Sequence, residues 1–475
     1  MKKVSRLAAF AFAMVAFAAG TIATYAVLEY NSHSIGHADE DFSEFLAVLN
    51  ELQNNHYFFD EDNDLIRGAI NGMIAATGDS YSSFFTLSDF QGAMSHLREH
   101  FYGIGAEIST INGSVTIVSP MIGSPAEEHG VLPGDVVISV DGVDVTDENQ
   151  REVVDRIRGP YGTVVSLGLL RSGSDFITID ITRGRIINET VSTDLFESNG
   201  NTIGYIRVST FGEATHRDFR DAIAQLEEKG IDSLIIDMRN NSGGYLNAVN
   251  AMVSYLLPSG LTVTSAVDRH GRETVHETRG SSSHRLPDIE IVTLINGGSA
   301  SAAEIFAAAM IESGGFEVIG TTSFGKGTVQ QSRPITDDSV LQMTIQAWLT
   351  PDGNLIEGYG VEPTIYVEPA EFMRILQVHL GGLDFFEYDM VHSGIATAQQ
   401  SLEALGYDVN RTDGYFDSST VEAVTLFQEN QGLDQTGKID GQTASAITMA
   451  MREKVRNPIY DTQIQAAIEL LGNTN

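Results

Sequence analysis

The chain of 475 residues contains no cysteine. This absence excludes disulfide bonds, zinc sites built from thiolates, and cysteine nucleophiles. Any nucleophile must therefore be a hydroxyl, an amine, a carboxylate or water.

Basic residues are also scarce. The chain has 28 Lys and Arg against 64 Asp and Glu, which gives a formal net charge of -36. A surface of this sign repels phosphate backbones and argues against nucleic acid as a partner. The remaining composition, 42% hydrophobic and 19% charged, is that of a folded globular protein. The length suggests about three domains.

The N-terminus combines positive charge with a long apolar run. Residues 7–28 carry no charge and follow Lys2, Lys3 and Arg6. A helix of this length can span a bilayer, since one crossing needs about 20 residues. We favour an uncleaved anchor because Thr24–Ala26 matches a signal cleavage site poorly. Residues 1–30 are thus predicted to be a membrane anchor or signal segment. The rest of the chain is expected outside the cytoplasm on a single-pass cell-membrane protein, or secreted if cleavage occurs near residue 26.

Four further regions follow from changes in residue pattern. Residues 31–97 read as a polar tether followed by amphipathic helices. Residues 98–184 alternate short apolar strands with glycine turns, which predicts a small strand-rich domain. Strands and helices alternate over 185–385, and residues 393–456 read as helices without a strand pattern. The sequence therefore predicts a multidomain α/β (α+β) protein.

A glycine-rich part of the strand-rich domain predicts a peptide-binding groove. Glycines around an apolar residue let backbone N–H groups converge on an anion, and a strand edge can accept a peptide as an extra strand. The runs Gly123–Ala126 and Gly130–Val137 resemble the PDZ domain of exported bacterial proteases. The resemblance assigns carboxylate binding to Tyr102, Gly103, Ile104 and Gly105. The expected helix side of the groove is Val153, Val154 and Ile157. The alternative is that these glycines only form turns.

Ser301 lies between a strand-like run, Ile291–Ile295, and an alanine-rich helix. A hydroxyl at such a junction is exposed beside the free N–H groups of a helix start, which can hold an oxyanion. None of the twelve histidines lies in a recognisable triad setting. Lys326 stands between two glycines in an apolar segment, and Gln330 would share its face if the segment is a strand. A buried lysine loses its proton readily and can act as base to a serine.

These residues resemble the active-site motifs of the carboxyl-terminal processing peptidases. Gly298–Glu304 matches the family's nucleophile motif, with Ala303 in place of a serine, and Lys326 follows Ser301 at the family's spacing of 25 residues. The resemblance covers about residues 44–370 and implies a ClpP/crotonase-like serine protease core with an inserted PDZ domain. It assigns catalytic roles to Ser301, Lys326 and Gln330.

A second motif of the same family precedes the first. Asp237–Gly244 matches the loop Asp-x-Arg-x-Asn-x-Gly-Gly, but Ser242 replaces the usual proline, so we expect a less rigid loop. The resemblance assigns the oxyanion hole to the N–H groups of Ala302 and of Gly243 or Gly244. We expect structural roles for Arg239, in a strand-end ion pair, and for Glu304, at the edge of the core.

Each of these residues also has an ordinary explanation. Taken singly, Ser301 fits a helix cap, Lys326 a solvated loop lysine and Gln330 a surface amide. Their joint spacing favours catalysis because separate coincidences multiply. The histidines between residues 270 and 284 lie in a polar stretch where solvation explains them better than metal binding. We therefore expect neither a metal nor a cofactor.

Residues 393–456 resemble the three-helix peptidoglycan-binding domain of wall-associated enzymes. Asp-Gly pairs at 413–414 and 440–441 read as turns, and apolar residues recur at helical spacing. The expected core residues are Leu402, Leu405, Val421, Val424 and Phe427. The alternative is a helical appendage that binds nothing.

The sequence thus predicts an extracytoplasmic serine endopeptidase tethered to membrane and cell wall. It would capture the C-terminal regions of protein substrates through the PDZ domain and cleave them with a Ser-Lys dyad. Expected partners are proteins or peptides with a free C-terminus, and peptidoglycan; homo-oligomerisation stays open. One alternative is a non-catalytic PDZ and wall-binding adaptor. Another is a glycan hydrolase, which needs paired carboxylates in a cleft that the sequence does not show.

Overall fold

The computed structural model describes residues 42–60, 64–111, 113–121, 123–171, 175–280, 289–375 and 377–473. Packing divides the chain into two units, with the boundary after Phe84. Within the described ranges, no helix combines the length and the apolar character needed to cross a membrane. The predicted anchor at residues 1–30 lies outside these ranges.

The described part of the first unit is mainly helical. Residues 42–55 form one helix, and α2 (Leu65–Ala75) forms another. The side chain of Asp64 caps α2 by accepting a hydrogen bond from the Arg67 amide at 2.8 Å. The helices predicted from apolar spacing in this region are thereby confirmed.

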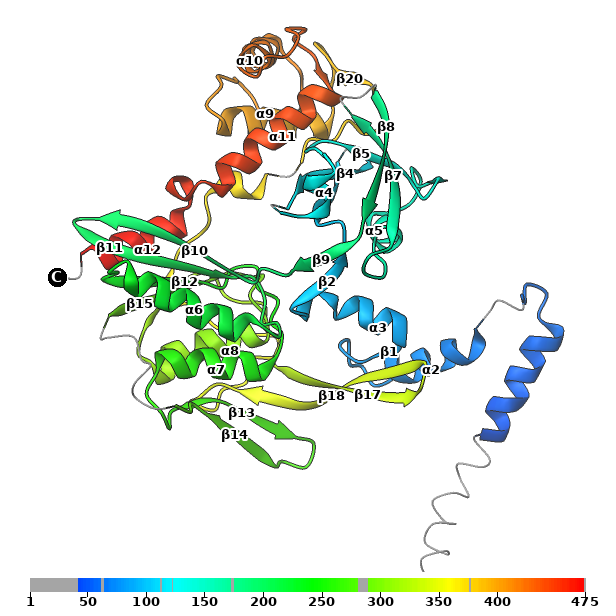
Figure 1. The fold of residues 1–475 in the computed structure, drawn as a ribbon, viewed down its shortest axis with the longest axis vertical. Coiled ribbons are helices and arrows are strands. Elements are labelled where there is room, and N and C mark those ends of the chain that lie inside the picture. Colours follow the sequence, from blue (N-terminus) through cyan, green and yellow to red (C-terminus); the bar gives the residue numbers. More distant parts are fainter. Residues whose placement is uncertain are drawn as a thin grey trace, which may run out of the picture. The chain divides into compact units, whose positions relative to one another are not determined.

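The strand-rich domain is a sheet with the strand order β3-β4-β5-β7-β8 (Figure 1). Its strands are β3 (Ala106–Ile111), β4 (Ser114–Pro120), β5 (Val136–Val140), β7 (Val164–Arg171) and β8 (Asp175–Thr182), with β6 (Val143–Asp144) paired to β5. The sequence pattern predicts strands over 106–111, 115–118, 136–140, 164–170 and 176–181, and each agrees with the observed strand to within two residues. The pattern predicts a helix over 147–157, but α5 (Gln150–Ile157) starts three residues later because Asn149 and Glu152 form a capping box there.

The region predicted to be the protease core contains a second sheet, with the strand order β10-β11-β12-β15-β16-β19. Its strands are β10 (Val191–Ser198), β11 (Asn201–Val208), β12 (Ser233–Asp237), β15 (Glu290–Ile295), β16 (Glu317–Gly320) and β19 (Ile365–Tyr366). All neighbours pair in parallel except β10 and β11. Parallel strands buried on both faces explain the continuous apolar runs of the sequence.

Helices cover both faces of this sheet. The helices on one face are α6 (Thr215–Glu228), α7 (Leu246–Leu256) and α8 (Ala302–Ala308), which continues as a π-helical turn, Ala309–Ser313. On the other face, α12 (Thr462–Gly472) packs Ile464 and Leu471 against Ile235 and Leu294. Figure 1 shows α12 beside β10 and β11. The helix α12 therefore belongs to the same domain as this sheet.

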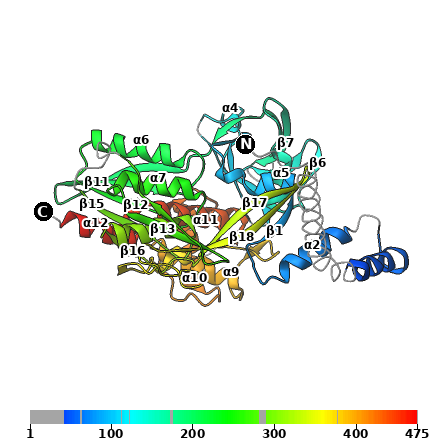
Figure 2. The ribbon, with the colours of Figure 1, turned by 90° about the horizontal axis from the view of Figure 1, so that it is seen from below.

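A smaller antiparallel sheet lies beside the core helices. It contains β17 (Thr328–Thr336), β18 (Ser339–Leu349), β13 (Thr262–Asp268) and β14 (Glu273–Glu277). Figure 2 shows β17 and β18 running together as a long hairpin. The start of β17 carries Gln330, and Lys326 lies just before it.

The C-terminal unit contains α9 (Ser393–Ala404), α10 (Ser418–Asn430) and α11 (Gly441–Arg456). Of the expected core residues, Leu402, Val424 and Phe427 are fully buried, while Leu405 and Val421 pack at the edge. The purely helical prediction is wrong in one detail: β20 (Phe385–Phe386) pairs with β21 (Ile439–Asp440). Strands of two residues are too short to show an alternating pattern.

Candidate active site

Ser301 occupies a strained turn between β15 and α8. Its φ of 54° lies in the left-handed region, which residues other than glycine rarely adopt. The preceding amide, Ala300 N, donates to the carbonyl of Asn241 at 2.9 Å. The strained turn is thus fixed against the loop that follows β12, since such strain persists only where surrounding structure holds it.

The loop after β12 places Gly243 in close contact with Ser301. Gly243 has a φ of 104°, and a Cβ there would lie 2.8 Å from the Ser301 Cβ and 3.0 Å from the Ala302 nitrogen. Asn241, fully buried, holds the loop by donating from Nδ2 to Val208 O. Position 243 therefore requires glycine both for its backbone angle and for its close approach to the nucleophile turn.

Two backbone amides near Ser301 remain open. Gly243 N donates to Asn241 Oδ1 at 2.9 Å, so this N–H is occupied. For Gly244 N and Ala302 N, no acceptor is found in the part of the chain that the structure describes. Of the two glycines between which the sequence could not decide, Gly244 is thus the one with an open N–H group.

Lys326 lies in a tightly packed loop directly before β17. Its carbonyl accepts a hydrogen bond of 2.8 Å from Nε1 of the buried Trp348. A Cβ on Gly327 would lie 2.5 Å from Glu357 N, and one on Gly325, whose φ is 91°, would lie 3.0 Å from Gly360 N. The flanking glycines are therefore needed because another segment crosses them closely, and the lysine between them is half-buried.

Gln330 is half-buried near the start of β17. Its Nε2 donates to Thr328 Oγ1 at 2.8 Å and to Thr344 Oγ1 at 3.2 Å. The expectation that Lys326 and Gln330 share one face of a strand is wrong in its premise, because β17 begins at Thr328 and Lys326 lies in the loop before it.

Glu304 joins the Ser301 turn to the Lys326 loop. Its carboxylate is fully buried and accepts four hydrogen bonds. Oε2 accepts from Ser301 N at 2.6 Å and from Lys326 N at 2.9 Å. Oε1 accepts from Ser323 Oγ at 2.6 Å and from Gly325 N at 2.7 Å. One buried side chain thus ties together the main chains of both predicted dyad residues. The sequence signal for this contact is the Ser-x-x-Glu spacing of a capping box.

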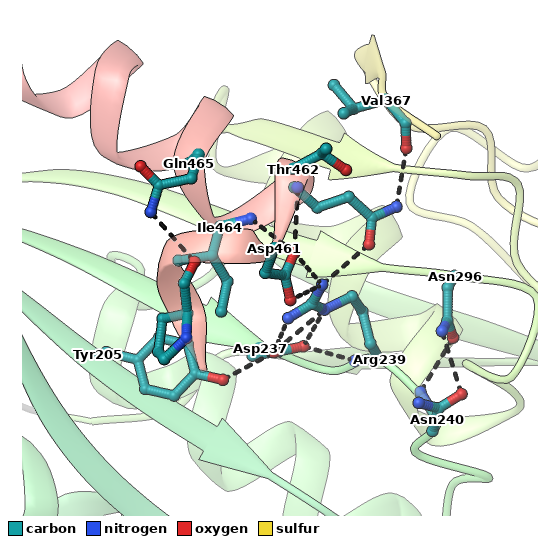
Figure 3. Close-up of polar contacts among 12 residues, drawn as sticks. Tyr205, Asp237, Arg239, Asn240, Asn296, Val367, Asp461, Thr462, Ile464 and Gln465 are labelled. Atoms are coloured by element: carbon teal, nitrogen blue, oxygen red, sulfur yellow. Dashed lines mark hydrogen bonds and ion pairs between the residues drawn. The ribbon is translucent and has the colours of Figure 1, made fainter. Parts of the chain in front are cut away.

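A buried charge cluster lies at the end of β12, where the nucleophile-facing loop begins (Figure 3). Arg239 donates from Nη2 to Asp237 at 2.6 Å, which confirms the predicted strand-end ion pair, and from Nη1 to Asp461 at 2.8 Å. Burial alone lowers the pKa of Arg239, but Asp237 and Asp461 outweigh burial and raise it. Tyr205 donates to Asp237 at 2.7 Å, and burial, with Asp237 adding to it, raises the pKa of this phenol. Sequence reasoning missed Asp461.

The PDZ groove is a cavity of about 260 Å³ between β3 and α5. Gly103, Ile104 and Gly105 line it, and Tyr102 is 42% exposed beside them. The residues expected on the helix side divide: Val154 and Ile157 line the groove, whereas Val153 is fully buried in the domain core.

A larger cleft of about 980 Å³ joins the PDZ domain to the protease core. Its lining includes Pro120, Met121, Gly123 and Ser124 of the strand-rich domain, residues 185–190, and Ser209, Thr210 and Ser242. Ser242 directly precedes Gly243 and Gly244. The cleft therefore reaches the loop that contacts Ser301.

Within the described residues, no group of three or more His, Asp and Glu side chains is arranged to hold a metal ion.

Comparison with known proteins identifies the family. The family model "Peptidase family S41" matches residues 202–367, a PDZ domain model matches 116–171, and a putative peptidoglycan binding domain matches 391–447. The carboxy-terminal processing protease CtpB of Bacillus subtilis (strain 168) is 36% identical over 423 residues, covering 89% of this chain and 87% of the relative. The chain belongs to the carboxy-terminal processing protease family. It is therefore a serine-type peptidase of the C-terminal processing class.

A second relative agrees with this protease family. CtpA of Bacillus subtilis (strain 168) is 34% identical, covering 94% of this chain and 93% of the relative. Among solved structures, a photosystem II D1 C-terminal processing protease is 27% identical with a TM-score of 0.43, covering 67% of this chain and 86% of that one.

Proposed function

We propose that the protease cleaves peptide bonds with Ser301 as nucleophile and Lys326 as general base. The observation that carries this proposal is the shared carboxylate oxygen of Glu304, which accepts from the amides of both residues. Two segments that are 25 residues apart in the sequence thereby meet at one buried atom. The chain has few lysines, and Lys326 lies half-buried between two glycines. In general, burial of a lysine amine disfavours its charged form, which allows a lysine to act as a base.

The proposed reaction follows the usual course of acyl transfer. Neutral Lys326 takes the proton of the Ser301 hydroxyl while Oγ attacks the substrate carbonyl carbon. The N–H groups of Ala302 and Gly244 donate to the oxyanion, because Gly243 N is already used by Asn241. The lysine then protonates the leaving amine, and the acyl-enzyme is hydrolysed by water that the lysine deprotonates.

We assign Gln330 to orienting the base. Its Nε2 is held by the hydroxyls of Thr328 and Thr344, which turns the carbonyl oxygen Oε1 away from them. That oxygen is the end of the side chain that can accept a hydrogen bond from a lysine amine.

Substrate capture is assigned to the PDZ groove. The backbone at Gly103–Gly105 forms one end of the groove, and a Cβ on Gly105 would lie 2.5 Å from the Ser124 Cβ, so the loop must stay bare. A free C-terminal carboxylate can be held by N–H groups of such a loop while the peptide adds to the edge of β3. Ser242 lines the large cleft, so a substrate chain bound in the PDZ groove can reach Ser301 through this cleft.

We further propose that the protease is anchored in the cell membrane, with its catalytic part outside the cytoplasm, and that residues 393–456 retain it at peptidoglycan. The uncharged run 7–28 supports the anchor, and the match to a peptidoglycan binding domain supports wall binding. Resistance of the full chain to carbonate extraction from membranes tests the anchor; complete release into the soluble fraction would contradict it.

Substitution of the dyad tests the proposed mechanism. Ser301→Ala and Lys326→Ala should each lower cleavage of a peptide with a free C-terminus by at least about 1,000-fold, because the pair acts as one unit. Lys326→Arg should fail equally, since a guanidinium does not deprotonate near neutral pH.

The controls for this test are Ser332→Ala and Lys229→Arg, which change exposed residues of the same types and should leave the rate unchanged. A serine-directed fluorophosphonate should label the wild-type chain but not Ser301→Ala. Near wild-type cleavage in either dyad variant would refute the assignment. An absence of both cleavage and labelling in the wild type would favour the non-catalytic adaptor.

A further inference from the structure

The chain leaves the protease core after β19 and returns to it at α12, and the two crossings lie side by side. Gln463 Nε2 donates to Val367 O at 2.7 Å, and Thr462 Oγ1 donates to Glu368 O at 2.7 Å. The predicted peptidoglycan-binding domain, residues 393–456 (the wall-binding unit), is therefore inserted between two neighbouring segments that both belong to the core. Figure 3 shows Val367 and Thr462 next to the buried charge cluster.

The return point contacts the catalytic loop directly. Arg239 Nη1 donates to both carboxylate oxygens of Asp461, at 2.9 and 2.8 Å, and to Gln463 Oε1 at 2.9 Å. The same guanidinium donates from Nε and Nη2 to Asp237. Every nitrogen of the Arg239 fork is thus bonded, with β12 on one side and α12 on the other.

Arg239 is the second residue of the segment that leads to the oxyanion donors. Its own amide donates to Asp237 Oδ1 at 2.9 Å. The next residue, Asn240, has a φ of 59° and donates from its amide to Asn296 Oδ1. Asn241 follows, with its carbonyl on Ala300 N and its side chain on Gly243 N. A short chain of bonded residues therefore runs from Asp461 to the glycines at Ser301.

The three charged side chains of this contact are almost fully buried. The side chains of Arg239, Asp237 and Asp461 are 12%, 3% and 9% exposed. A buried ion pair gives little net stability compared with apolar packing, but the loss of one partner leaves a charge poorly compensated. Without the Asp461 carboxylate, the second side of the Arg239 fork keeps only the neutral amide oxygen of Gln463, which binds it less strongly, so the side chain can shift together with the loop.

We propose that Asp461 is a positioning residue for the catalytic loop, acting through Arg239 on the oxyanion donor Gly244. The active site is thereby completed by a helix that lies beyond the wall-binding unit in the sequence. This inference rests on the proposed peptidase mechanism, and it adds a residue of α12 to the determinants of the rate.

Asp461→Asn in the full chain tests the proposal. Asp461 also caps α12, since Oδ1 accepts from Gln463 N at 3.0 Å and from Ile464 N at 3.1 Å. Asparagine caps helices as well as aspartate does, so the substitution keeps the cap, removes the negative charge that faces Arg239, and replaces one carboxylate acceptor there by an amide donor. We expect kcat to fall by about tenfold or more, because small misplacements of reacting groups are costly, while KM stays within about twofold.

A matched control is Asp440→Asn. Asp440 caps α11 in the same way, accepting from Thr443 N at 2.8 Å, and lies in the wall-binding unit. This variant should keep the wild-type kcat. Equal losses in both variants would show a general effect of removing helix caps.

Inhibitor affinity separates positioning from mere stability. A peptide aldehyde forms a tetrahedral adduct with Ser301 whose oxygen occupies the oxyanion hole, so its affinity for Asp461→Asn should fall by the same factor as kcat. Peptide binding in the Ser301→Ala background should not change. Unchanged aldehyde affinity with unchanged kcat would overturn the inference. If the wild-type chain itself does not cleave the peptide, the proposed mechanism is overturned instead.

A double-mutant cycle provides the second variant. Arg239→Lys removes the fork that joins Asp237 to Asp461. If Asp461 acts through Arg239, the losses of kcat in Arg239→Lys and Asp461→Asn should not multiply in the double variant. Fully multiplicative losses would mean that Asp461 acts by another route.

Discussion

At the scale of single residues, Glu304 joins the main chains of the two residues proposed as the catalytic dyad. Each of its oxygens accepts two hydrogen bonds, and all four donors belong to the Ser301 turn or the Lys326 loop. A carboxylate is the only protein side chain with two oxygen atoms that both accept hydrogen bonds and donate none. The residue type is therefore dictated by the donors around it.

Glu304→Gln should damage both rate and stability. One end of the new amide is a donor and faces two N–H or O–H groups that lose their acceptor. At about 1–3 kcal/mol for each buried unsatisfied group, we expect a loss of about 2–6 kcal/mol in the free energy of unfolding. We also expect a kcat at least about 100-fold lower, since both the nucleophile turn and the base loop lose a fixed point.

Denaturant unfolding and steady-state kinetics measure these two effects. Glu312→Gln is the control, because Glu312 accepts a single amide hydrogen bond from Asp352, at 2.7 Å, away from the dyad. Retention of wild-type kcat in Glu304→Gln would show that the two loops hold their positions without this carboxylate.

At the scale of elements, the loop after β12 packs closely against the turn that contains Ser301. Gly243→Ala places a Cβ 2.8 Å from the Ser301 Cβ and 2.9 Å from Ala300 O, in addition to an unfavourable backbone angle. We expect loss of cleavage by about 100-fold or more, because either Ser301 or the oxyanion donors must move.

Gly271→Ala is the matched control for this substitution. Gly271 also has a positive φ, 75°, but a Cβ there meets no atom within 4 Å. It should cost stability through backbone strain alone and leave kcat unchanged. Similar losses of kcat in the two variants would mean that close approach to Ser301 is not what requires glycine at position 243.

In the PDZ groove, the side chain of Gln150 occupies a backbone acceptor that a bound peptide would need. Gln150, the first residue of α5, donates from Nε2 to Ile108 O at 3.0 Å, on the edge strand β3. A peptide that adds to β3 needs such carbonyl groups as acceptors. Gln150→Ala should therefore bind a C-terminal peptide about 2–10-fold more tightly, as one net hydrogen bond is worth about 0.5–1.5 kcal/mol.

Calorimetric titration in the Ser301→Ala background measures this affinity without cleavage. Arg151→Ala, at the exposed neighbouring position, serves as the control. Weaker binding by Gln150→Ala would mean that Gln150 contacts the peptide instead of blocking it.

The active-site residues that the sequence could predict are those in local motifs. Ser301, Lys326 and the glycine pair could be proposed as site residues because the spacing of their motifs can be read directly from the sequence. Asp461 could not be found in this way, since it lies 222 residues from Arg239 and follows a further domain, residues 393–456, in the sequence. Nor could the hydrogen bond that occupies Gly243 N, because a choice between adjacent amides depends on loop geometry.

The role of the last helix was likewise hidden from the sequence. Ile464, Ala467 and Leu471 have helical spacing, which suits packing on the preceding helices as well as packing on a distant sheet. Only the parallel sheet of the core, whose second face needs a cover, explains why α12 belongs to the protease.

At the scale of the whole molecule, the protease core encloses the wall-binding unit in sequence. Truncation and excision should therefore have different effects. A chain that ends at residue 370 loses α12 and exposes Ile235, Leu294 and their neighbours, which are fully or almost fully buried. Since uncovering even one large apolar side chain costs about 2–5 kcal/mol, this truncated chain should lose most of its stability and all cleavage.

An excised chain, in which a ten-residue Gly/Ser linker replaces residues 371–456, should behave differently. The two ends to be joined lie close, because Glu368 O and Thr462 Oγ1 are 2.7 Å apart, and such a linker spans about 17 Å. It keeps α12 and Asp461, so cleavage of a short soluble peptide should stay within about twofold of the wild type. It should no longer sediment with purified peptidoglycan, while the intact chain should do so even at high salt, because a net charge of -36 gives no electrostatic attraction to anionic wall polymers. Equal sedimentation of both chains would refute wall binding by this unit, and an inactive excised chain would show that the unit itself supports the catalytic core.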